Sequence, residues 1–214
     1  MIDVNRIERI ARTFFADGRG SHGWDHTLRV VRLAQRIARA EDADLDVVVT
    51  AAFFHDIGRS AEDEARGNLC HADYGAELAG PILDRNGFGL TPAQQENVLH
   101  CIRSHRFRGR ETPATLEAKV VFDADKLDAI GAIGIARAYL FAGEIGARLH
   151  CPEIPLSETL PYTTSDTGYR EYAVKLRTIR DIMLTTEGRR MANDRHRFME
   201  GFFDRFLQEY EGER

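Results

Sequence analysis

Apolar residues along most of this chain recur with the 3.6-residue period of an α-helix. Val30, Leu33 and Ile37 form one such stripe, and Phe198 and Phe202 belong to another near the end of the chain. A helix needs this spacing to bury one face, whereas a half-buried strand needs strict alternation. No segment shows the sustained alternation of β-branched residues that is typical of strands. The pattern therefore predicts an all-α protein.

Helix boundaries are indicated by caps, glycines and prolines. A first helix is expected to end at the turn of residues 17–20. Further helices are expected from near Asp25, from about Leu45 to Gly58, from about His71 to Asn86, from Thr91 to about His105, and from about Ala114 onwards. The proline-rich residues 149–168 are predicted to form a long surface loop. Beyond this loop, another helix is predicted from apolar residues at i, i+4, i+7 and i+11, namely Tyr172, Leu176, Ile179 and Met183, and a last helix follows it.

Length and charge narrow the class of protein. The chain has 214 residues, of which 43% are hydrophobic and 29% charged, and its net charge is −5. This length is within reach of a single domain, and the composition argues against a disordered, collagen-like or disulfide-rich secreted chain. A protein that binds nucleic acid mainly through its phosphates needs a strongly basic face. We therefore expect a small substrate and no stable nucleic-acid binding.

Cysteine usage and the lack of long apolar runs indicate the compartment. Cys70, Cys101 and Cys151 form no CxxC pair, which predicts free thiols in a reducing environment. The first residues lack the basic end and the unbroken apolar run of a secretory signal. No stretch approaches the length of a membrane span. We therefore expect a cytoplasmic protein.

Three segments place metal-binding residue types on apolar helical faces. His26 lies on the buried side of its predicted helix. His55 and Asp56 end a helix that is apolar nearly all round, and a buried carboxylate is costly unless it is paired or bound to a cation. The adjacent imidazole and carboxylate offer two ligands to one point. Acids interrupt an apolar run again at Asp123 and Asp125.

Three blocks of sequence carry a resemblance to a known family. They are residues 23–30 (GWDHTLRV), residues 53–58 (FFHDIG) and residues 123–132 (DADKLDAIGA). With these blocks the chain, from about residue 20 to 205, resembles the HD-domain superfamily of metal-dependent phosphohydrolases, and in particular its small stand-alone bacterial branch. The resemblance implies a single HD-type helical bundle over residues 1–214. Its motif core would lie at about residues 20–135, with additional C-terminal helices at about residues 165–210.

The periodicity alone leaves open which aspartate completes the metal site, because Asp123 and Asp125 both lie on apolar faces. The resemblance implies Asp125, which begins an acid-basic-leucine run. Asp123 would then be a supporting acid. The implied ligands of one divalent ion are therefore His26, His55, Asp56 and Asp125.

Two imidazoles and two carboxylates suit Mn²⁺, Fe²⁺, Co²⁺, Ni²⁺ or Mg²⁺, and they leave coordination positions open for water. Such a cation lowers the pKa of the bound water and withdraws charge from the phosphoryl oxygen under attack. Asp56, Lys126 and Arg59 are the predicted catalytic residues. Lys126 and Arg59 flank the ligands and are candidates to stabilise the leaving phosphate.

Substrate contacts are predicted for His71, His105, Arg103 and Lys126. His71 and His105 share helix faces with apolar residues, so both are expected to point inward. Additional histidines hold a second metal in some branches of the family, but a single ion is predicted here.

Other charged residues near these segments allow two readings. A polyphosphate could bind four arginines that are close in sequence, namely Arg103, Arg106, Arg108 and Arg110, although a solvated face is the simpler interpretation. Glu62 and Asp63 could orient the attacking water, although a charged loop is the simpler interpretation there.

The leading hypothesis is a metal-dependent phosphohydrolase that acts on a nucleotide or a similar small phosphorylated metabolite. The chain lacks the Gly-Tyr-Pro signature of the cyclic-dinucleotide phosphodiesterase branch and the Glu-Asp that follows His-Asp in the alarmone hydrolases. Two alternatives stay open. One is a non-catalytic, metal-containing module that binds a nucleotide or metabolite. The other is a di-iron oxygenase, which would need His71, His105 and further carboxylates around a second metal.

Overall fold

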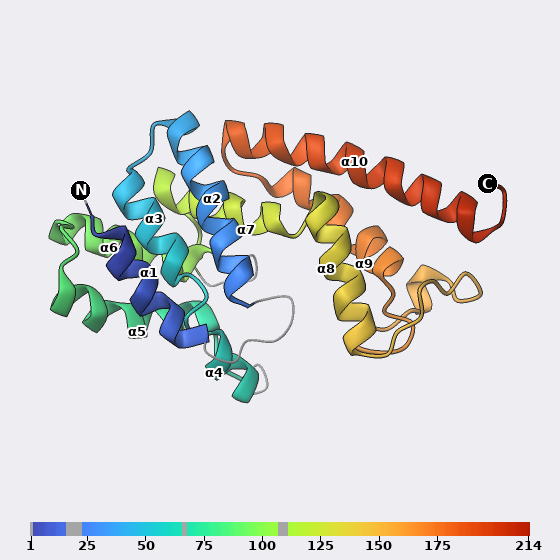
Figure 1. Cartoon of the computed structure of the whole chain (residues 1–214), viewed down its shortest axis with the longest axis horizontal. Coiled ribbons are helices and arrows are strands. Elements are labelled where there is room, and N and C mark those ends of the chain that lie inside the picture. Colours follow the sequence, from blue (N-terminus) through green and yellow to red (C-terminus); the bar gives the residue numbers. More distant parts are fainter. Residues whose placement is uncertain (1, 16–22, 66–67, 107–110) are drawn as a thin grey trace. The chain divides into compact units, whose positions relative to one another are not determined.

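The computed structural model describes residues 2–15, 23–65, 68–106 and 111–214, and within these ranges all regular elements are helical. This confirms the all-α prediction. The α-helices are α1 (Val4–Arg12), α2 (Trp24–Glu41), α3 (Leu45–Phe54), α4 (Arg59–Glu64), α5 (His71–Asn86), α6 (Pro92–Ser104), α7 (Leu116–Asp128), α8 (Gly131–Glu144), α9 (Gly168–Val174) and α10 (Thr186–Tyr210) (Figure 1). Short 3-10 segments lie at Thr13–Phe15, Leu156–Glu158 and Leu176–Ile182.

The chain divides into two compact units. The first comprises Met1–Asp125 and Leu184–Glu187, and the second comprises Lys126–Met183 and Gly188–Arg214. The proposal of one domain over residues 1–214 stays a prediction. The site discussed below lies in the first unit.

Helix α3 is the central element of the first unit. It contacts α1, α2 and α6 (Figure 1). All residues from Val47 to Phe54 are buried, as expected for a helix that is apolar around its whole circumference. The Asp44 carboxylate caps the helix by accepting hydrogen bonds from the amides of Asp46 and Val47. The predicted buried helix is confirmed.

This helix ends earlier than the sequence suggested. We expected it to continue to Gly58, but α3 stops at Phe54 and residues 55–58 form a turn. The Ile57 amide donates to the Phe54 carbonyl and the Arg59 amide to the Asp56 carbonyl, so bonds to the third preceding residue replace the α-helical ones. The chain then enters α4 at Arg59.

Helices α5 and α6 pack against each other, and α6 also packs against α3. Their predicted boundaries are confirmed to within one residue. Thr91 and Gln94 form a reciprocal capping box at the start of α6, and Pro92 occupies the first turn. The predicted end of the first helix, at residues 17–20, lies outside the described residues.

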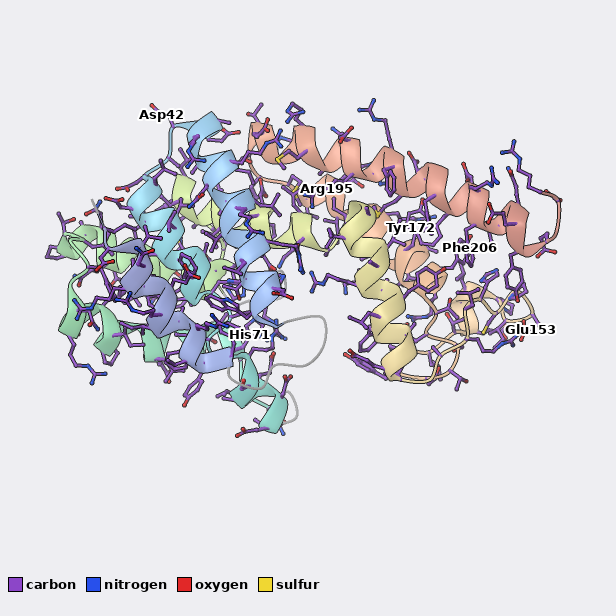
Figure 2. All side chains as sticks on the ribbon, viewed as in Figure 1. Asp42, His71, Glu153, Tyr172, Arg195 and Phe206 are labelled. Carbon is purple, nitrogen blue, oxygen red and sulfur yellow. The ribbon has the colours of Figure 1, made fainter. Side chains whose placement is uncertain are left out.

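The second unit contains α8, α9 and most of α10. Residues 149–167 form the predicted loop, apart from the 3-10 turn at Leu156–Glu158. In this unit α9 contacts α8, and Tyr172 of α9 stacks on Phe203 of α10 with ring centroids 4.2 Å apart. Figure 2 labels Tyr172 among the side chains of this unit.

The prediction of one α-helix around residues 172–183 is wrong, because most of this segment is a 3-10 helix. Helix α9 ends at Val174, Lys175 leaves the helical region at φ −136° and ψ −58°, and a 3-10 segment follows. Leu176 and Ile179 are still buried, because residues three apart share a face in a 3-10 helix as they nearly do in an α-helix. The apolar spacing therefore could not distinguish the two helix types.

Two further expectations concern cysteines and membrane spans. The three cysteines are free thiols, and Cys101 and Cys151 are buried. Among the helices of the described ranges, none combines the length and the hydropathy that crossing a bilayer requires.

Candidate metal centre

The site is built around the turn that joins α3 to α4. A Cβ atom on Gly58 would lie 2.4 Å from the carbonyl oxygen of His71 and 2.8 Å from the amide nitrogen of Gly75. The first turn of α5 can therefore approach this turn only because residue 58 is glycine. As a result the His71 Nε2 atom lies 3.4 Å from Asp56 Oδ1, although fifteen positions separate them in sequence. Figure 2 labels His71.

Four side chains from α2, the α3–α4 turn and α7 form what we call the first donor group: His26, His55, Asp56 and Asp125. His26 Nε2 lies 3.3 Å from His55 Nε2, 3.7 Å from Asp56 Oδ2 and 3.4 Å from Asp125 Oδ1. His55 Nε2 lies 3.5 Å from Asp56 Oδ2. His26, His55 and Asp56 are buried, whereas the Asp125 side chain is 16% exposed. The donor atoms of His26, His55 and Asp56 are all within 4.8 Å of one another, as one ion requires.

A second donor group uses the other oxygen of Asp56 together with His71 and His105. Asp56 Oδ1 lies 3.4 Å from His71 Nε2 and 3.6 Å from His105 Nε2, and the two imidazole nitrogens are 3.2 Å apart. All three side chains are buried. Asp56 therefore directs one carboxylate oxygen toward each group, and His71 and His105 point inward as predicted.

Three of the four imidazoles are oriented through their Nδ1 atoms. His55 Nδ1 donates to the carbonyl oxygen of Ala52 at 2.8 Å, and His105 Nδ1 donates to that of Ile102 at 2.7 Å. His71 Nδ1 lies 2.7 Å from Glu62 Oε2. Because carbonyl and carboxylate oxygens only accept hydrogen bonds, the protons sit on Nδ1. In the neutral rings, each Nε2 lone pair therefore faces the cluster.

This donor set fits a divalent cation. Two atoms that bind one ion at about 2.1 Å lie about 3.0 Å apart at a right angle and about 3.4 Å apart at the tetrahedral angle. The separations among His26, His55 and Asp56, from 3.3 to 3.7 Å, and the 3.4 Å from His26 Nε2 to Asp125 Oδ1 are close to these values. Buried lone pairs and a buried carboxylate also favour a positive charge between them.

Burial and charge set the protonation states that metal ligands need. Desolvation lowers the pKa of His55 to about 4, although the Asp56 carboxylate opposes this shift. Desolvation also lowers the pKa of His71 to about 2, and the nearby His105 adds to the effect. Burial alone would raise the pKa of Asp56, but His55, His105 and Arg59 outweigh it and hold this pKa well below its usual range. Neutral imidazoles and an ionised carboxylate are the ligand forms that bind metals.

Glu62 corrects one interpretation of the sequence. The simpler interpretation of the sequence makes it part of a charged loop, but it lies on the buried side of α4 and is 6% exposed. Its Oε2 atom also accepts from Arg59 Nη1 at 2.8 Å, and its Oε1 atom lies 3.0 Å from Arg106 Nη1. The neighbouring Asp63 is exposed. The spacing of three residues between Arg59 and Glu62 was the sequence signal for this pair.

Asp123 and Asp125 have different surroundings. Asp125 lies beside His26, whereas both oxygens of Asp123 accept hydrogen bonds from the chain at Leu184 and Thr185. The Thr185 hydroxyl donates to Asp123 Oδ2 at 2.7 Å as well. Asp125 thus lies beside one of the donors, His26, whereas Asp123 binds the chain at residues 184–185. The assignment of Asp125 as a ligand stays a prediction.

The remaining predicted residues are less closely tied to the cluster. Lys126 follows Asp125 in α7 and is half-buried. Arg103 donates to Glu111 and to Glu96, both at 3.0 Å. Arg106 contacts Glu62, as described above. Arg108 and Arg110 lie outside the described residues. The substrate contacts assigned to Lys126 and Arg103 stay predictions.

Comparisons with known proteins agree with this geometry. A family model described as HD domain matches residues 23–130, about half of the chain. The YpgQ protein of Bacillus subtilis is 34% identical over 207 residues, which cover 93% of this chain and 91% of YpgQ. Ribonuclease Y of Chloroflexus aurantiacus is 31% identical over 121 residues, but these cover 56% of this chain and 21% of that enzyme.

Solved structures give the same result. Bacillus subtilis YpgQ in complex with ADP aligns with a TM-score of 0.73 at 32% identity, covering 97% of both chains. An HD-superfamily hydrolase from Bacillus thuringiensis aligns with a TM-score of 0.76 at 26% identity, covering 97% of this chain and 96% of the other. The similarity to an HD-superfamily hydrolase and the His/Asp cluster support a metal-dependent hydrolase. The chain belongs to the HD domain family.

Proposed function

We propose that this chain is a metal-dependent phosphohydrolase in which water attacks phosphorus of a nucleotide or a similar small phosphorylated metabolite. The observation that carries the proposal is the first donor group. The donor atoms of His26, His55 and Asp56 lie within 4.8 Å of one another, and Asp125 Oδ1 lies 3.4 Å from His26 Nε2. Such a set leaves positions free in an octahedral coordination sphere, as a catalytic site needs.

His26, His55, Asp56 and Asp125 would hold one divalent ion of Mn, Fe, Co, Ni or Mg. Such an ion supplies Lewis acidity toward a water molecule and a phosphoryl oxygen. Burial keeps His55 neutral, and the Ala52 carbonyl fixes the ring so that Nε2 faces the cluster. The Asp56 carboxylate is ionised for the same task.

Cationic side chains beside these donors suit a phosphorylated substrate. The Arg59 side chain is 24% exposed, and its Nη2 atom lies 3.4 Å from Asp56 Oδ1, so it can donate to a phosphoryl oxygen at the edge of the site. Lys126, next to Asp125 in sequence, is assigned the leaving phosphate. His71 and His105 contact the substrate through the inner side of the cluster, and Arg103 contacts its outer part.

The nucleotide class is supported by a relative. Bacillus subtilis YpgQ, which aligns over 97% of this chain, has been crystallised in complex with ADP. A site for a nucleoside phosphate would also join the compact anionic group that a metal and an arginine recognise to a larger organic part. We therefore assign nucleoside phosphates as the substrate class.

A panel of nucleoside mono-, di- and triphosphates, assayed with Mn²⁺ and with Mg²⁺, tests the proposal. Phosphate and pyrophosphate are detected separately, and a short RNA serves as a comparison substrate. We expect hydrolysis that EDTA abolishes and that His55→Ala and Asp56→Ala lose together with bound metal, while the helical circular dichroism is kept. Activity that survives either substitution without metal would contradict the mechanism.

The same measurements separate the alternatives. A metal-containing binding module would bind nucleotides and metal but release no phosphate or pyrophosphate from any substrate in the panel. The second donor group is the observation that favours a di-iron oxygenase, because it places two imidazoles beside the shared Asp56. One metal equivalent per chain would count against an oxygenase, and two irons with oxygen consumption would favour it.

A further inference from the structure

We propose that the Arg59 guanidinium serves as the second cation of this centre, so that Asp56, His71 and His105 hold no second divalent ion. This inference rests on the single-ion centre of the proposed function. It gives Arg59 a role in deciding the number of metal ions, in addition to its contact with the substrate.

Arg59 lies close to two atoms of the second donor group. Arg59 Nη2 lies 3.4 Å from Asp56 Oδ1 and 3.3 Å from His71 Nε2. These distances match the 3.2–3.6 Å that separate the three donor atoms from one another. The guanidinium nitrogen therefore lies as close to these two donor atoms as the donor atoms lie to one another. An ion bound there would sit next to a fixed positive charge.

Arg59 can also donate hydrogen bonds to these two atoms. With its Nδ1 proton directed at Glu62, a neutral His71 presents a bare lone pair at Nε2, and Asp56 Oδ1 is an acceptor as well. Arg59 Nη2 is a donor within reach of both atoms. A guanidinium stays charged in proteins, so it gives these buried acceptors a proton donor and a positive charge at once.

The Glu62 carboxylate anchors the Arg59 side chain. Glu62 Oε2 accepts from Arg59 Nη1 at 2.8 Å and from His71 Nδ1 at 2.7 Å, so one oxygen orients both side chains. Glu62 is itself buried, and Arg106 Nη1 lies 3.0 Å from its other oxygen. Arg59 is three-quarters buried at this place. The buried Glu62 carboxylate thus holds the Arg59 charge beside the second donor group.

Asp56 shows the consequence for the whole cluster. Its Oδ2 atom faces His26 and His55, whereas its Oδ1 atom faces His71, His105 and Arg59. One carboxylate thereby serves a divalent ion on one side and a guanidinium on the other. Removing the guanidinium would leave three donors suitable for a second ion.

Mn²⁺ binding to the full chain tests the proposal. Equilibrium dialysis counts the ions, and electron paramagnetic resonance distinguishes an isolated Mn²⁺ from a spin-coupled pair. We expect one equivalent and an isolated-ion spectrum for the wild type. Arg59→Met and Arg59→Gln, which remove the charge, should bind two equivalents and give a coupled spectrum. Arg59→Lys keeps a positive charge and should bind one.

Arg106→Met is the matched control, because it removes a neighbouring positive charge that contacts Glu62; it should bind one equivalent. Two equivalents in the wild type would overturn the proposal, as would one equivalent in both Arg59→Met and Arg59→Gln with native circular dichroism. No bound Mn²⁺ in the wild type would instead contradict the metal centre of the proposed function. The number of Mn²⁺ ions bound by the wild type can contradict the proposal by itself, so the test holds even if an Arg59 variant fails to fold.

Discussion

Three histidines of this centre, His55, His71 and His105, are oriented by the oxygen atom that accepts the Nδ1 proton. Two of these oxygens are main-chain carbonyls within the same helical turn, and any sequence that forms the helix provides them. The third belongs to the Glu62 side chain, nine residues before His71 in the sequence. Only this third contact can be removed by one substitution without changing the backbone.

Replacing Glu62 with Gln should change the tautomer of His71. The amide can present a donor to Nδ1, so a population with the proton on Nε2 should appear. Long-range ¹⁵N correlation spectra of the metal-free protein measure this directly, with His71→Gln used to assign the signals. The exposed Glu64→Gln is a matched control and should leave the spectrum unchanged. Identical His71 shifts in the wild type and Glu62→Gln would show that Glu62 does not set the tautomer.

The stability of the metal-free protein should depend on pH through His55. Its pKa is lowered to about 4 by burial, whereas an unfolded histidine titrates near 6.5. Between these values the unfolded chain binds more protons, so the free energy of unfolding falls as the pH decreases through this window. The shift corresponds to about 3 kcal/mol for this one group.

Urea unfolding of EDTA-treated protein at pH 7 and at pH 4.5 measures that effect. In His55→Gln the titrating group is absent, so the dependence on pH should weaken by about one proton per chain. An equal dependence in the two proteins would argue that His55 is not buried in its neutral form.

At the residue scale the sequence could predict the ligand types but not their partners. His26, His55 and Asp56 were recognisable because polar side chains interrupted apolar helical faces. Glu62 was misread because a short polar segment after a turn has no apolar periodicity that would show its buried side. The contacts of Glu62 join residues 59, 71 and 106, and such pairings depend on packing between helices.

At the scale of elements, the α3–α4 turn decides how closely α5 approaches the donors. Gly58→Ala should destabilise the protein by about 2 kcal/mol or more, because its Cβ would overlap main-chain atoms of His71 and Gly75. Retained metal should also fall, since the turn that contains Gly58 carries His55 and Asp56.

Gly201→Ala in α10 is the control, because a Cβ there meets nothing within 4 Å. This substitution should stabilise the helix by up to about 1 kcal/mol. Thermal unfolding and metal content of both variants provide the comparison. Equal stability of Gly58→Ala and the wild type would mean that the close approach is not required.

The two aspartates of α7 provide another test at this scale. Asp123→Ala removes a buried carboxylate that binds the chain at Leu184 and Thr185, so stability should fall by about 3 kcal/mol while metal is retained. Asp125→Ala should have the opposite pattern, with metal lost and the metal-free protein about as stable as before. Metal content and urea unfolding are measured on both variants. Loss of metal only in Asp123→Ala would reverse the assignment.

Element types were predictable where caps and apolar periodicity agreed. Thr91, Pro92 and Gln94 marked the start of α6 without help from tertiary structure. The segment after Lys175 was misassigned, because an i, i+3 apolar repeat is compatible with both α and 3-10 backbones. The early end of α3 had no sequence signal apart from Gly58, whose role is a close contact with α5.

At the scale of the whole molecule, the centre depends on segments that lie far apart in sequence. His26, His55 and Asp125 come from α2, the α3–α4 turn and α7, yet all lie in the first unit. Sequence blocks identified these segments because each combines a ligand with an apolar helix. The sequence predicts a single ion, but it could not show the position of the Arg59 guanidinium, on which we propose that this number depends.

Anomalous diffraction from crystals grown with Mn²⁺ tests the central claim most directly. We predict one strong peak per chain, within about 2.3 Å of His26 Nε2, His55 Nε2, Asp56 Oδ2 and Asp125 Oδ1. A map without a peak at these four atoms, or with its strongest peak at other side chains, would contradict the account.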